Sequence, residues 1–525
     1  MERIKLGEKD VFVRRASGLV RTLNAWDVMW YNIVWMAPMA ITVYGIWAQQ
    51  LFPGVDLPMT AVISVFISLV IGVFYAMFSA AMPRSGGDYI WISRVLHPVL
   101  GFMGIFFLFV AILGIAGSYV PWFTQWGIAP ILEFTGHSAA AEYISGTNFN
   151  FMLAIVIYIL YAVLISRGAK PTMRFLSILG ILIVIGWLAF VGTLLTTPVD
   201  VFKANFNALS GMNYDQVIAR ARSLGLPGGA VLSATLFGVV LTYLNFTGFN
   251  SSVYMAGEIK EVHKTQLIGI VAAILVFGVI DWFVYYASYV GMGESFIIAM
   301  ANLQAKGDPI YTLPFPPFLH FLFRFATRNP LVFGLACFGW SMMTIGAILT
   351  YVFFAVRVIF ATSFDRILPS GLSKVDARYN SPYTALIFTT IVAIVMQALW
   401  TYTPLLNYFV YLMLGWMIFQ AFASIAGIIF PYTHKDLFET SPSIARKMVG
   451  PVPLLSILGV ASLILSIWVG WASIAPAYVG TVNPAYVGFV FLLFAIGAAI
   501  YVASWLYHRR KGIPLELIFK QLPPE

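Results

Sequence analysis

The sequence is poor in cysteine and in charge. Its one cysteine, Cys337, cannot form an intramolecular disulfide, and no histidine or second cysteine stands near it in its apolar run to suggest a metal site. Only 10% of the 525 residues are charged, whereas 60% are hydrophobic. A chain with this balance does not fold in water, so the composition predicts that lipid surrounds most of it.

Groups that would support catalysis are also missing. The six histidines are dispersed and lie mostly in loops or at the ends of apolar runs: His97, His137, His263, His320, His434 and His508. No pair of them suggests a metal site or a catalytic triad, so neither an enzyme nor a bound cofactor is expected. No basic stripe interleaved with aromatic residues indicates nucleic-acid binding, and no filter-like loop indicates a channel.

Long apolar runs are what the sequence does contain. The run from Pro58 to Met82 has no charged residue and is long enough to cross the roughly 30 Å hydrocarbon core as a helix. The whole chain, read in this way, predicts an all-α polytopic membrane protein with about twelve spans. We expect them at 24–51, 58–82, 93–126, 149–166, 172–196, 230–257, 266–292, 330–361, 382–401, 404–431, 450–475 and 483–507.

Lysine and arginine positions predict the orientation of these spans. All but six of the 30 fall in segments that lie in the cytoplasm if the N-terminus does. The six exceptions, in two long outer loops, are Lys203, Arg220, Arg222, Lys306, Arg324 and Arg328. Both tails, 1–23 and 508–525, are therefore expected in the cytoplasm. The chain is expected as a single domain in the plasma membrane, where a net charge of +9 attracts anionic lipid head groups rather than nucleic acid.

Two of the expected spans are interrupted. Pro38 in the first span cannot donate a backbone hydrogen bond and clashes with the carbonyl one turn earlier. The sixth span contains polar side chains and a glycine in the run 245–252. A kink without function is the alternative for each break taken alone. Because the breaks stand five spans apart, and a five-helix repeat reverses direction, the pattern predicts inverted copies over 24–196 and 230–431, followed by two helices over 450–507.

The two breaks predict a binding site near the middle of the membrane. Half-helix N-termini offer free amides to a carboxylate, and half-helix C-termini offer carbonyls to an ammonium group, so a zwitterionic amino acid would fit. The neutral side chain of Asn250 favours neutral amino acids over polyamines or arginine. The expected site residues are Trp35, Met36 and Ala37 in the first span and Phe246, Thr247, Gly248 and Asn250 in the sixth, with Gly114, Ser118 and Tyr119 of the third as further lining.

Three motifs carry a resemblance to a known family. They are Pro83-Arg84-Ser85-Gly86-Gly87-Asp88-Tyr89 followed by Gly101-Phe102; Phe246-Thr247-Gly248-Phe249 with Glu258 after it; and Asp365-Arg366-Ile367-Leu368-Pro369 with Ser381-Pro382-Tyr383. Over nearly its whole length the chain resembles the amino acid-polyamine-organocation superfamily. The resemblance implies the five-plus-five inverted-repeat fold of the leucine transporter, and alternating-access transport of amino acids or related amines.

The chain departs from that family in three places. Ala37-Pro38-Met39 stands where the first helix usually has a glycine-serine-glycine break. Lys260-Glu261-Val262-His263 follows Glu258, where the family usually has an asparagine-proline pair. The segment from Phe175 to Thr197 lacks the lysine that replaces sodium in some proton-coupled members, so that route to proton coupling is not expected.

The coupling ion is left open between sodium and a proton. A sodium site in the resembled fold would use hydroxyls such as Ser341 and Thr344, although such hydroxyls often bond to their own helix. A proton could use Asp281, since buried acids in membranes are costly, with a structural hydrogen bond as the alternative. The sequence thus predicts a secondary active transporter of neutral amino acids that works by ion-coupled symport. An exchanger of amino acids or polyamines and a non-transporting sensor on the same fold are the alternatives, and the oligomeric state is not indicated.

Overall fold

The structure, a computed structural model, describes residues 18–404, 408, 411–475 and 482–522. Within them the regular secondary structure is helical, apart from one pair of two-residue strands, β1 (Met448–Val449) and β2 (Val452–Pro453), and an isolated bridge between Leu23 and Ile259. Eleven helices are long and apolar enough to cross a membrane. The chain is therefore a multi-pass integral membrane protein.

Two shorter helices precede these candidate spans. They are α1 (Ala25–Trp35) and α2 (Ile41–Leu51), joined by the short 3-10 helix η1 (Pro38–Ala40). At 11 residues each, α1 and α2 are too short to cross the bilayer separately. The longer helices are α3 (Leu57–Ala81), α5 to α6 (Pro98–Phe134), α8 (Thr147–Ser166), α9 (Ala169–Thr196), α12 to η3 (Leu232–Glu258), α13 (Val262–Met292), α16 (Pro330–Phe364), α17 (Tyr383–Tyr402), α18 (Leu412–Thr433), α20 (Leu454–Ala472) and α22 (Pro484–Arg510).

Most predicted spans agree with these helices to within a few residues, but the third helical segment continues to Phe134, beyond the predicted end at 126, and α13 begins at Val262 rather than at 266. Three further starts also differ. The run predicted from 93 includes the end of a separate helix, α4 (Asp88–Val95), so α5 begins only at residue 98. The span predicted from 450 begins at 454, because the strand pair occupies the preceding residues. The span predicted from 172 begins at 169, directly after Gly168, whose positive φ of 98° ends the preceding turn. The start of the span predicted at 404 lies partly outside the described residues.

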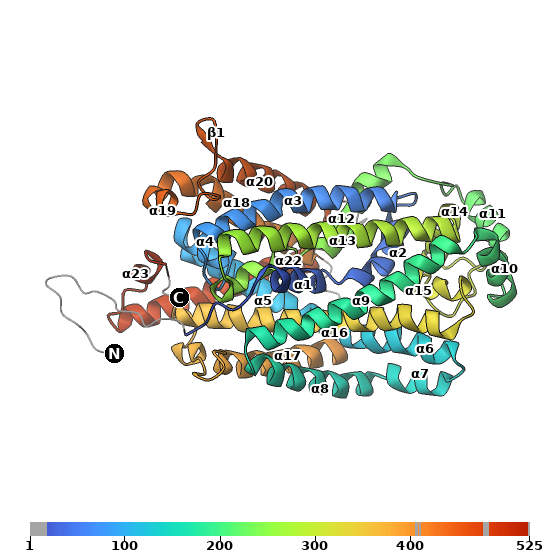
Figure 1. Cartoon of the computed structure of the whole chain (residues 1–525), viewed down its shortest axis with the longest axis horizontal. Helices are drawn as coiled ribbons and strands as arrows, with labels where there is room; N and C mark the ends of the chain where they lie inside the picture. Colours follow the sequence, from blue (N-terminus) through green and yellow to red (C-terminus); the bar gives the residue numbers. More distant parts are fainter. Residues whose placement is uncertain (1–17, 405–407, 409–410, 476–481, 523–525) are drawn as a thin grey trace.

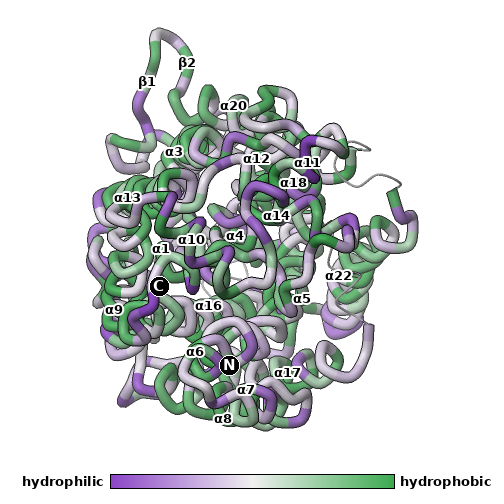
Figure 2. Tube along the Cα trace, turned by 90° about the vertical axis from the view of Figure 1, so that its right-hand side faces the viewer, coloured by the Kyte–Doolittle hydropathy of each residue, from purple (hydrophilic) through white to green (hydrophobic). Residues whose placement is uncertain are grey.

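The long helices run side by side, and their connections gather at two ends of the molecule (Figure 1). The described start of the chain, α4, α19 (Lys435–Thr440) and α23 (Glu516–Phe519) lie at one end. The other end holds α10 (Val199–Leu209), α11 (Tyr214–Ser223) and α14 (Glu294–Ala305). Figure 2, seen from this second end, shows hydrophobic residues along most of the outer helices and hydrophilic ones in connections such as α11.

Helix α16 lies at the centre of the bundle. Its most apolar stretch is 94% buried, compared with 33% for α8 and α17 and 28% for α22. It contacts α1, α5, α9 and α17. The outer helices expose large apolar side chains such as Leu160, Ile391 and Phe491, which in a bilayer face the lipid chains.

Helices α9 and α16 approach each other through a pair of glycines. A Cβ atom on Gly186 would lie 2.6 Å from the Cα atom of Gly339, and one on Gly339 would lie 2.7 Å from the Cα atom of Gly186. Helix backbones in membranes come this close where small residues meet. The contact sets the distance between two helices that both pack on α1.

Alanine at Gly186 should push α9 and α16 apart and destabilise the folded protein by about 1–3 kcal/mol, the usual range for an overpacked core. Unfolding of the detergent-purified protein by heat or denaturant measures the change. Gly192→Ala on the same helix is the matched control, because nothing lies within 4 Å of a Cβ atom there. Equal losses in the two variants would contradict the close contact as the cause.

Candidate functional site

The first break separates α1 from η1 and α2. A capping box begins α1, in which the Asn24 and Asp27 side chains each accept from the other's backbone amide. The helix ends where Ala37 takes a left-handed conformation with φ of 54° and Pro38 follows, an arrangement that costs roughly 1–2 kcal/mol for a residue other than glycine. No described residue donates a hydrogen bond to the Met36 carbonyl. The break thus leaves a backbone acceptor unpaired inside the bundle.

The second break lies between α12 (Leu232–Phe246) and the 3-10 helix η3 (Ser251–Glu258). Thr247 leaves the helical conformation and Gly248 has a positive φ of 97°, which glycine adopts without strain. Among the described residues, the amides of Gly248 and Asn250 find no acceptor and the Thr247 carbonyl finds no donor. This break therefore carries both unpaired donors and an unpaired acceptor.

Packing and a polar network bring the two breaks together. A Cβ atom on Gly248 would lie 1.7 Å from the Trp35 ring, so only glycine lets the breaks approach this closely. Asn32 of α1 donates to the Ser252 hydroxyl at 3.1 Å and accepts from the Ser252 amide at 3.0 Å. Gln266 of α13 accepts from the same hydroxyl at 2.7 Å. The half-helices are thus fixed to one another and to α13.

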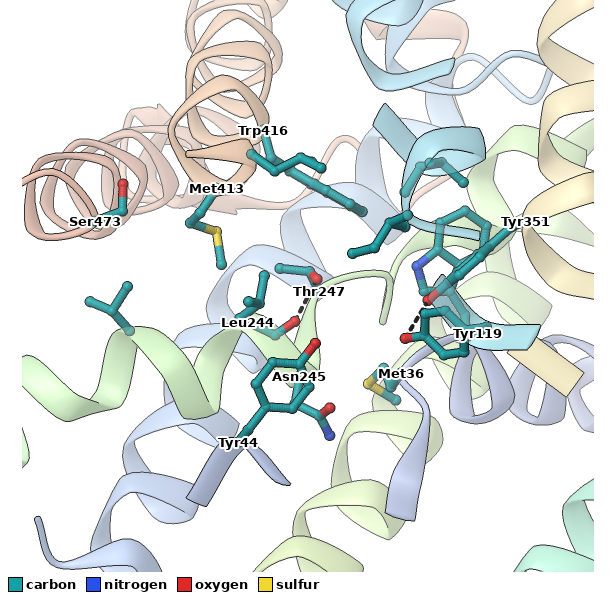
Figure 3. A pocket seen from close by; sticks show the side chains of 15 residues that line it. Met36, Tyr44, Tyr119, Leu244, Asn245, Thr247, Tyr351, Met413, Trp416 and Ser473 are labelled. Carbon is teal, nitrogen blue, oxygen red and sulfur yellow. Dashed lines mark hydrogen bonds between the residues drawn. The ribbon is translucent and has the colours of Figure 1, made fainter. Parts of the chain in front are cut away.

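A cavity of about 90 Å³ lies between the breaks (Figure 3). That volume is several times the roughly 10–15 Å³ that one water molecule needs. None of the described residues that line it is charged. The lining residues are Trp35, Met36, Tyr44, Ile112, Ile115, Tyr119, Val240, Leu244, Asn245, Thr247, Tyr351, Leu412, Met413, Trp416 and Ser473.

Polar side chains occupy separate parts of the cavity wall. The Tyr351 hydroxyl of α16 donates to the Tyr119 hydroxyl of α5 at 3.1 Å (Figure 3). The Thr247 hydroxyl donates to the Leu244 carbonyl at 2.6 Å. The side-chain nitrogen of Asn245 is buried without a hydrogen-bond partner among the described residues. Because an unpaired buried donor costs about 1–3 kcal/mol, a ligand that accepts from Asn245 would recover that energy.

The cavity brings together part of the predicted site. Four of the expected residues line it: Trp35, Met36, Tyr119 and Thr247. The six that do not are Ala37, Gly248 and Asn250, which shape the breaks, and Phe246, Gly114 and Ser118, which are buried close by. Phe246 packs on Phe277 with ring centroids 4.8 Å apart, and the Ser118 hydroxyl donates to a carbonyl of its own helix at 2.7 Å.

Other lining residues were not among those expected. Asn245 belongs to the polar run 245–252 that indicated the break, so its signal was present in the sequence. Nothing in the sequence distinguishes Tyr44 or Tyr351 from the many other aromatic residues. The wall from α18, which includes Trp416, depends on a helix far along the chain and has no sequence signal.

Three residues were expected to couple transport to an ion, and the surroundings of Ser341 and Thr344 differ from those of Asp281. The hydroxyls of Ser341 and Thr344 donate to carbonyls of their own helix, those of Cys337 at 3.0 Å and Ser341 at 2.7 Å. Asp281 of α13 is fully buried, and the Tyr285 side chain of the same helix interacts with its carboxyl group. Burying an ionised carboxylate without a positively charged partner is very costly, so these surroundings favour its neutral, protonated form.

The fifth span contains one lysine because it begins earlier than expected. Lys170, in the first turn of α9, pairs with Asp27 in the first turn of α1 at 2.5 Å. Asp27 precedes Trp35 by roughly 12 Å along the helix, so the pair lies away from the breaks. The stretch 175–197 itself contains no lysine, as the sequence shows.

Buried polar contacts close the end of the bundle that holds the described start of the chain. Glu258, the last residue of η3, forms a two-bond ion pair with Arg357 of α16 at 2.9 and 3.1 Å, and both side chains are buried. The amides of Thr22 and Leu23, ahead of α1, both donate to the Glu258 carbonyl, at 2.9 and 3.0 Å. The later halves of the sixth and eighth spans are thus joined to the start of the first.

Asp88, the first residue of α4, is a buried acid at the same end. The Tyr75 hydroxyl of α3 donates to its carboxylate at 3.1 Å, and Tyr254 of η3 also hydrogen-bonds to it. Burial raises the pKa of Asp88 to about 7, although the bonds from Tyr254 and Tyr75 act in the opposite direction. A carboxyl that changes charge near neutral pH therefore contacts the second half of the broken sixth span.

Comparisons with known proteins agree on the class of this chain. A family model described as amino acid permease matches residues 28–506. The chain is 25% identical over 470 residues to a branched-chain amino acid permease of Bacillus subtilis (strain 168), which covers 87% of this chain and 90% of that protein. It is 24% identical over 364 residues to one of Lactococcus lactis subsp. cremoris (strain MG1363), covering 67% and 69%. A methylthioribose transporter of Bacillus subtilis is 23% identical over 454 residues, covering 84% and 87%.

Replacing Asp88 by asparagine should remove a pH dependence of stability. The folded-state pKa of about 7 lies above the ordinary value of 3.8, so the contribution of Asp88 to stability is complete at low pH and is lost as pH rises toward 7. The loss amounts to roughly 4 kcal/mol at most. Melting temperatures measured from about pH 5 to 8 should show the wild type losing stability relative to Asp88→Asn as pH rises. Parallel curves would show that Asp88 does not titrate in this range.

Proposed function

Because the chain belongs to the amino acid permease family, we propose that it is a secondary active transporter of neutral amino acids with apolar side chains. It would work by alternating access across the plasma membrane, with the cavity between the breaks as the substrate site. One observation carries the proposal: backbone groups without partners among the described residues stand at both breaks, beside an uncharged cavity.

Helix packing supports the five-plus-five inverted repeat. In such a repeat each of the first five spans has a counterpart, five spans later, that runs in the opposite direction. Four of these pairs are in contact: α1 and α2 with η3 and α12, α3 with α13, α5 with α16, and α8 with α17. Counting α1, η1 and α2 as one interrupted span adds a twelfth to the 11 longer candidates. Helices α20 and α22 then follow the repeat.

The breaks supply partners for both charges of an amino acid. We assign the substrate carboxylate to the amides of Gly248 and Asn250, and the ammonium group to the carbonyls of Met36 and Thr247. Hydrogen bonds to a charged group are roughly twice as strong as those between neutral groups. Pro38 has no amide to offer, so the carboxylate is assigned to the second break.

The apolar part of the wall supports selection by side chain. Ile112, Ile115, Val240, Leu412 and Met413 line the cavity, and no lining residue in the described part of the chain carries a charge that could pair with an acidic or basic substrate. One methylene group more or less in such a pocket changes binding by about 1–3 kcal/mol. The two relatives named as branched-chain amino acid permeases fit this selectivity.

We assign coupling to a proton carried by Asp281. Its carboxyl group is fully buried beside the Tyr285 side chain of the same helix, and a neutral hydroxyl of this kind can remain next to the carboxyl group whether or not it carries a proton. The hydroxyls of Ser341 and Thr344 already bond within their helix and are the sites of the sodium-coupled alternative. If neither a proton gradient nor a sodium gradient drives uptake, the protein is an exchanger.

We propose that both ends of the chain lie on the cytoplasmic side. The described start of the chain and α23 lie at the same end of the bundle (Figure 1). Basic residues such as Arg94, Lys170 and Arg357 belong to this end, where they make ion pairs. An excess of lysine and arginine is typical of cytoplasmic connections.

Uptake and counterflow in proteoliposomes test the proposed activity. Labelled leucine, isoleucine, valine, phenylalanine, glutamate, lysine and methylthioribose are compared with no gradient, an inward proton gradient or an inward sodium gradient. We expect accumulation of the branched apolar amino acids under the proton gradient, because the cavity is apolar and uncharged. Movement of methylthioribose alone would contradict the substrate class. Binding without movement of any solute would contradict transport.

Asp281→Asn should separate coupling from translocation. Asparagine keeps the size of the side chain but cannot exchange a proton, so proton-driven accumulation should fall by about tenfold or more while counterflow continues. The variants Ser341→Ala and Thr344→Val test the sodium-coupled alternative in the same assay. If these two variants abolish accumulation and Asp281→Asn does not, the assignment to a proton is wrong.

A further inference from the structure

A β-hairpin, made of β1 and β2, projects sideways from the bundle between α19 and α20. The strands pair antiparallel, with Val449 opposite Val452 and Met448 opposite Pro453. Figure 1 shows the hairpin leaving the bundle across the direction of the long helices, and Figure 2, seen along the bundle, shows it extending beyond the outer helices. Because the long helices cross the bilayer, a segment that leaves them at this angle runs along the membrane surface.

Local chemistry fixes the shape of the hairpin and its place on α20. Gly450, with a positive φ of 59°, and Pro451 are the two residues between the strands. A glycine with positive φ in the first position is typical of a tight two-residue hairpin turn. At the base, the Leu454 amide donates to the Lys447 carbonyl at 2.8 Å, and Leu454 is the first residue of α20. The hairpin is therefore attached directly to the end of a candidate membrane span.

The hairpin exposes apolar side chains. Met448, Val449 and Val452 are 47%, 52% and 38% exposed, and none of the three belongs to the apolar core of the described residues. Apolar side chains gathered on one exposed segment indicate a surface that contacts a partner or a membrane. The helix that follows exposes Ile457 and Val460, which face lipid in a bilayer. The apolar surface of the hairpin thus leads, along the chain, into the lipid-facing surface of α20.

Basic residues stand at the start of the hairpin. Arg446 and Lys447 directly precede β1, and both are exposed. Segments that lie at the boundary between water and hydrocarbon combine apolar side chains with lysine and arginine. Each basic residue near an anionic lipid surface contributes about 1 kcal/mol of attraction. The charge and the apolar side chains of the hairpin therefore match the two layers of a membrane surface.

We propose that this hairpin is a membrane anchor that inserts its apolar side chains, Met448, Val449 and Val452, at the boundary between head groups and hydrocarbon. Arg446 and Lys447 then contact the phosphates of anionic phospholipids. The anchor holds the connection between α19 and α20 against the bilayer. It requires only that α20 crosses a membrane, so neither the transport proposal nor the cavity between the breaks is needed for it.

Fluorescence quenching in proteoliposomes measures the depth of the hairpin. The full-length Val449→Cys variant carries a thiol-reactive fluorophore and is reconstituted into phosphatidylglycerol and phosphatidylcholine, the same mixture in both leaflets. Brominated acyl chains quench a label that lies in the hydrocarbon, and iodide, present on both sides, quenches one that lies in water. The matched control carries the label at Glu439→Cys, an exposed position of α19. Wild-type protein, whose cysteine is buried, is the blank for labelling.

We expect brominated lipid to quench the label at residue 449 at least about twofold more than the label at residue 439, and iodide to quench it less. A label at 449 that iodide quenches as strongly as the label at 439 would overturn the anchor. A label at 449 that is shielded from both quenchers would also overturn it, because protein, such as a second copy of the chain, would then cover the hairpin.

Removing the two charges tests the contact with head groups. Arg446→Gln with Lys447→Gln, made in the labelled Val449→Cys protein, should lower quenching by brominated lipid by about twofold or more. Arg509→Gln with Arg510→Gln, which removes the same charge at the end of α22, should leave the quenching unchanged. Equal effects of the two double variants, or no effect of the first, would overturn the role of Arg446 and Lys447.

Discussion

The hydrocarbon core of a bilayer offers no hydrogen bonds, and the whole structure depends on how the chain meets that constraint. Continuous helices satisfy it along the long spans, since each amide finds a carbonyl within its own helix. The exceptions that matter occur at Met36 and at Thr247 to Asn250, where groups without partners among the described residues stand beside a cavity. Irregular backbone is tolerated at membrane depth where it lines such a space. The breaks are therefore a cost of the fold, and they supply the unpaired backbone groups on which the proposed substrate site depends.

Holding two interrupted spans side by side requires close packing on all sides. Gly248 lets the Trp35 ring fit against the second break, and Asn32 joins α1 to Ser252. The central helix α16 is fixed against α9 through Gly186 and Gly339. Small residues let helix backbones come close together. The Asn32 side-chain amide forms hydrogen bonds to the second break, where the regular helical hydrogen bonds are interrupted. The interrupted spans are thereby enclosed by continuous ones.

Charged side chains are distributed unevenly along the bundle. The lining residues that the structure describes for the cavity between the breaks are all uncharged. At the end that holds the described start of the chain, Glu258 and Arg357 pair with each other in a buried site, and Asp88 has a pKa near neutrality. A buried ion pair gives little net stability but is strongly unfavourable to break on one side only. The pair therefore ties η3 to α16 at this end of the bundle.

The sequence by itself determined the class of the protein. Charge-free runs, basic residues on alternate connections, and the two interruptions predicted the membrane helices and breaks, because hydropathy and backbone chemistry are local properties. The family motifs added amino acid transport, which the family match confirms at the level of an amino acid permease. Among the site residues, Trp35 and Thr247 could be named in advance because they stand in the breaks. Tyr351, Trp416 and the pairing of Lys170 with Asp27 could not, since each depends on which helices meet. Packing between helices hundreds of residues apart decides those contacts, and no local pattern in the chain records it.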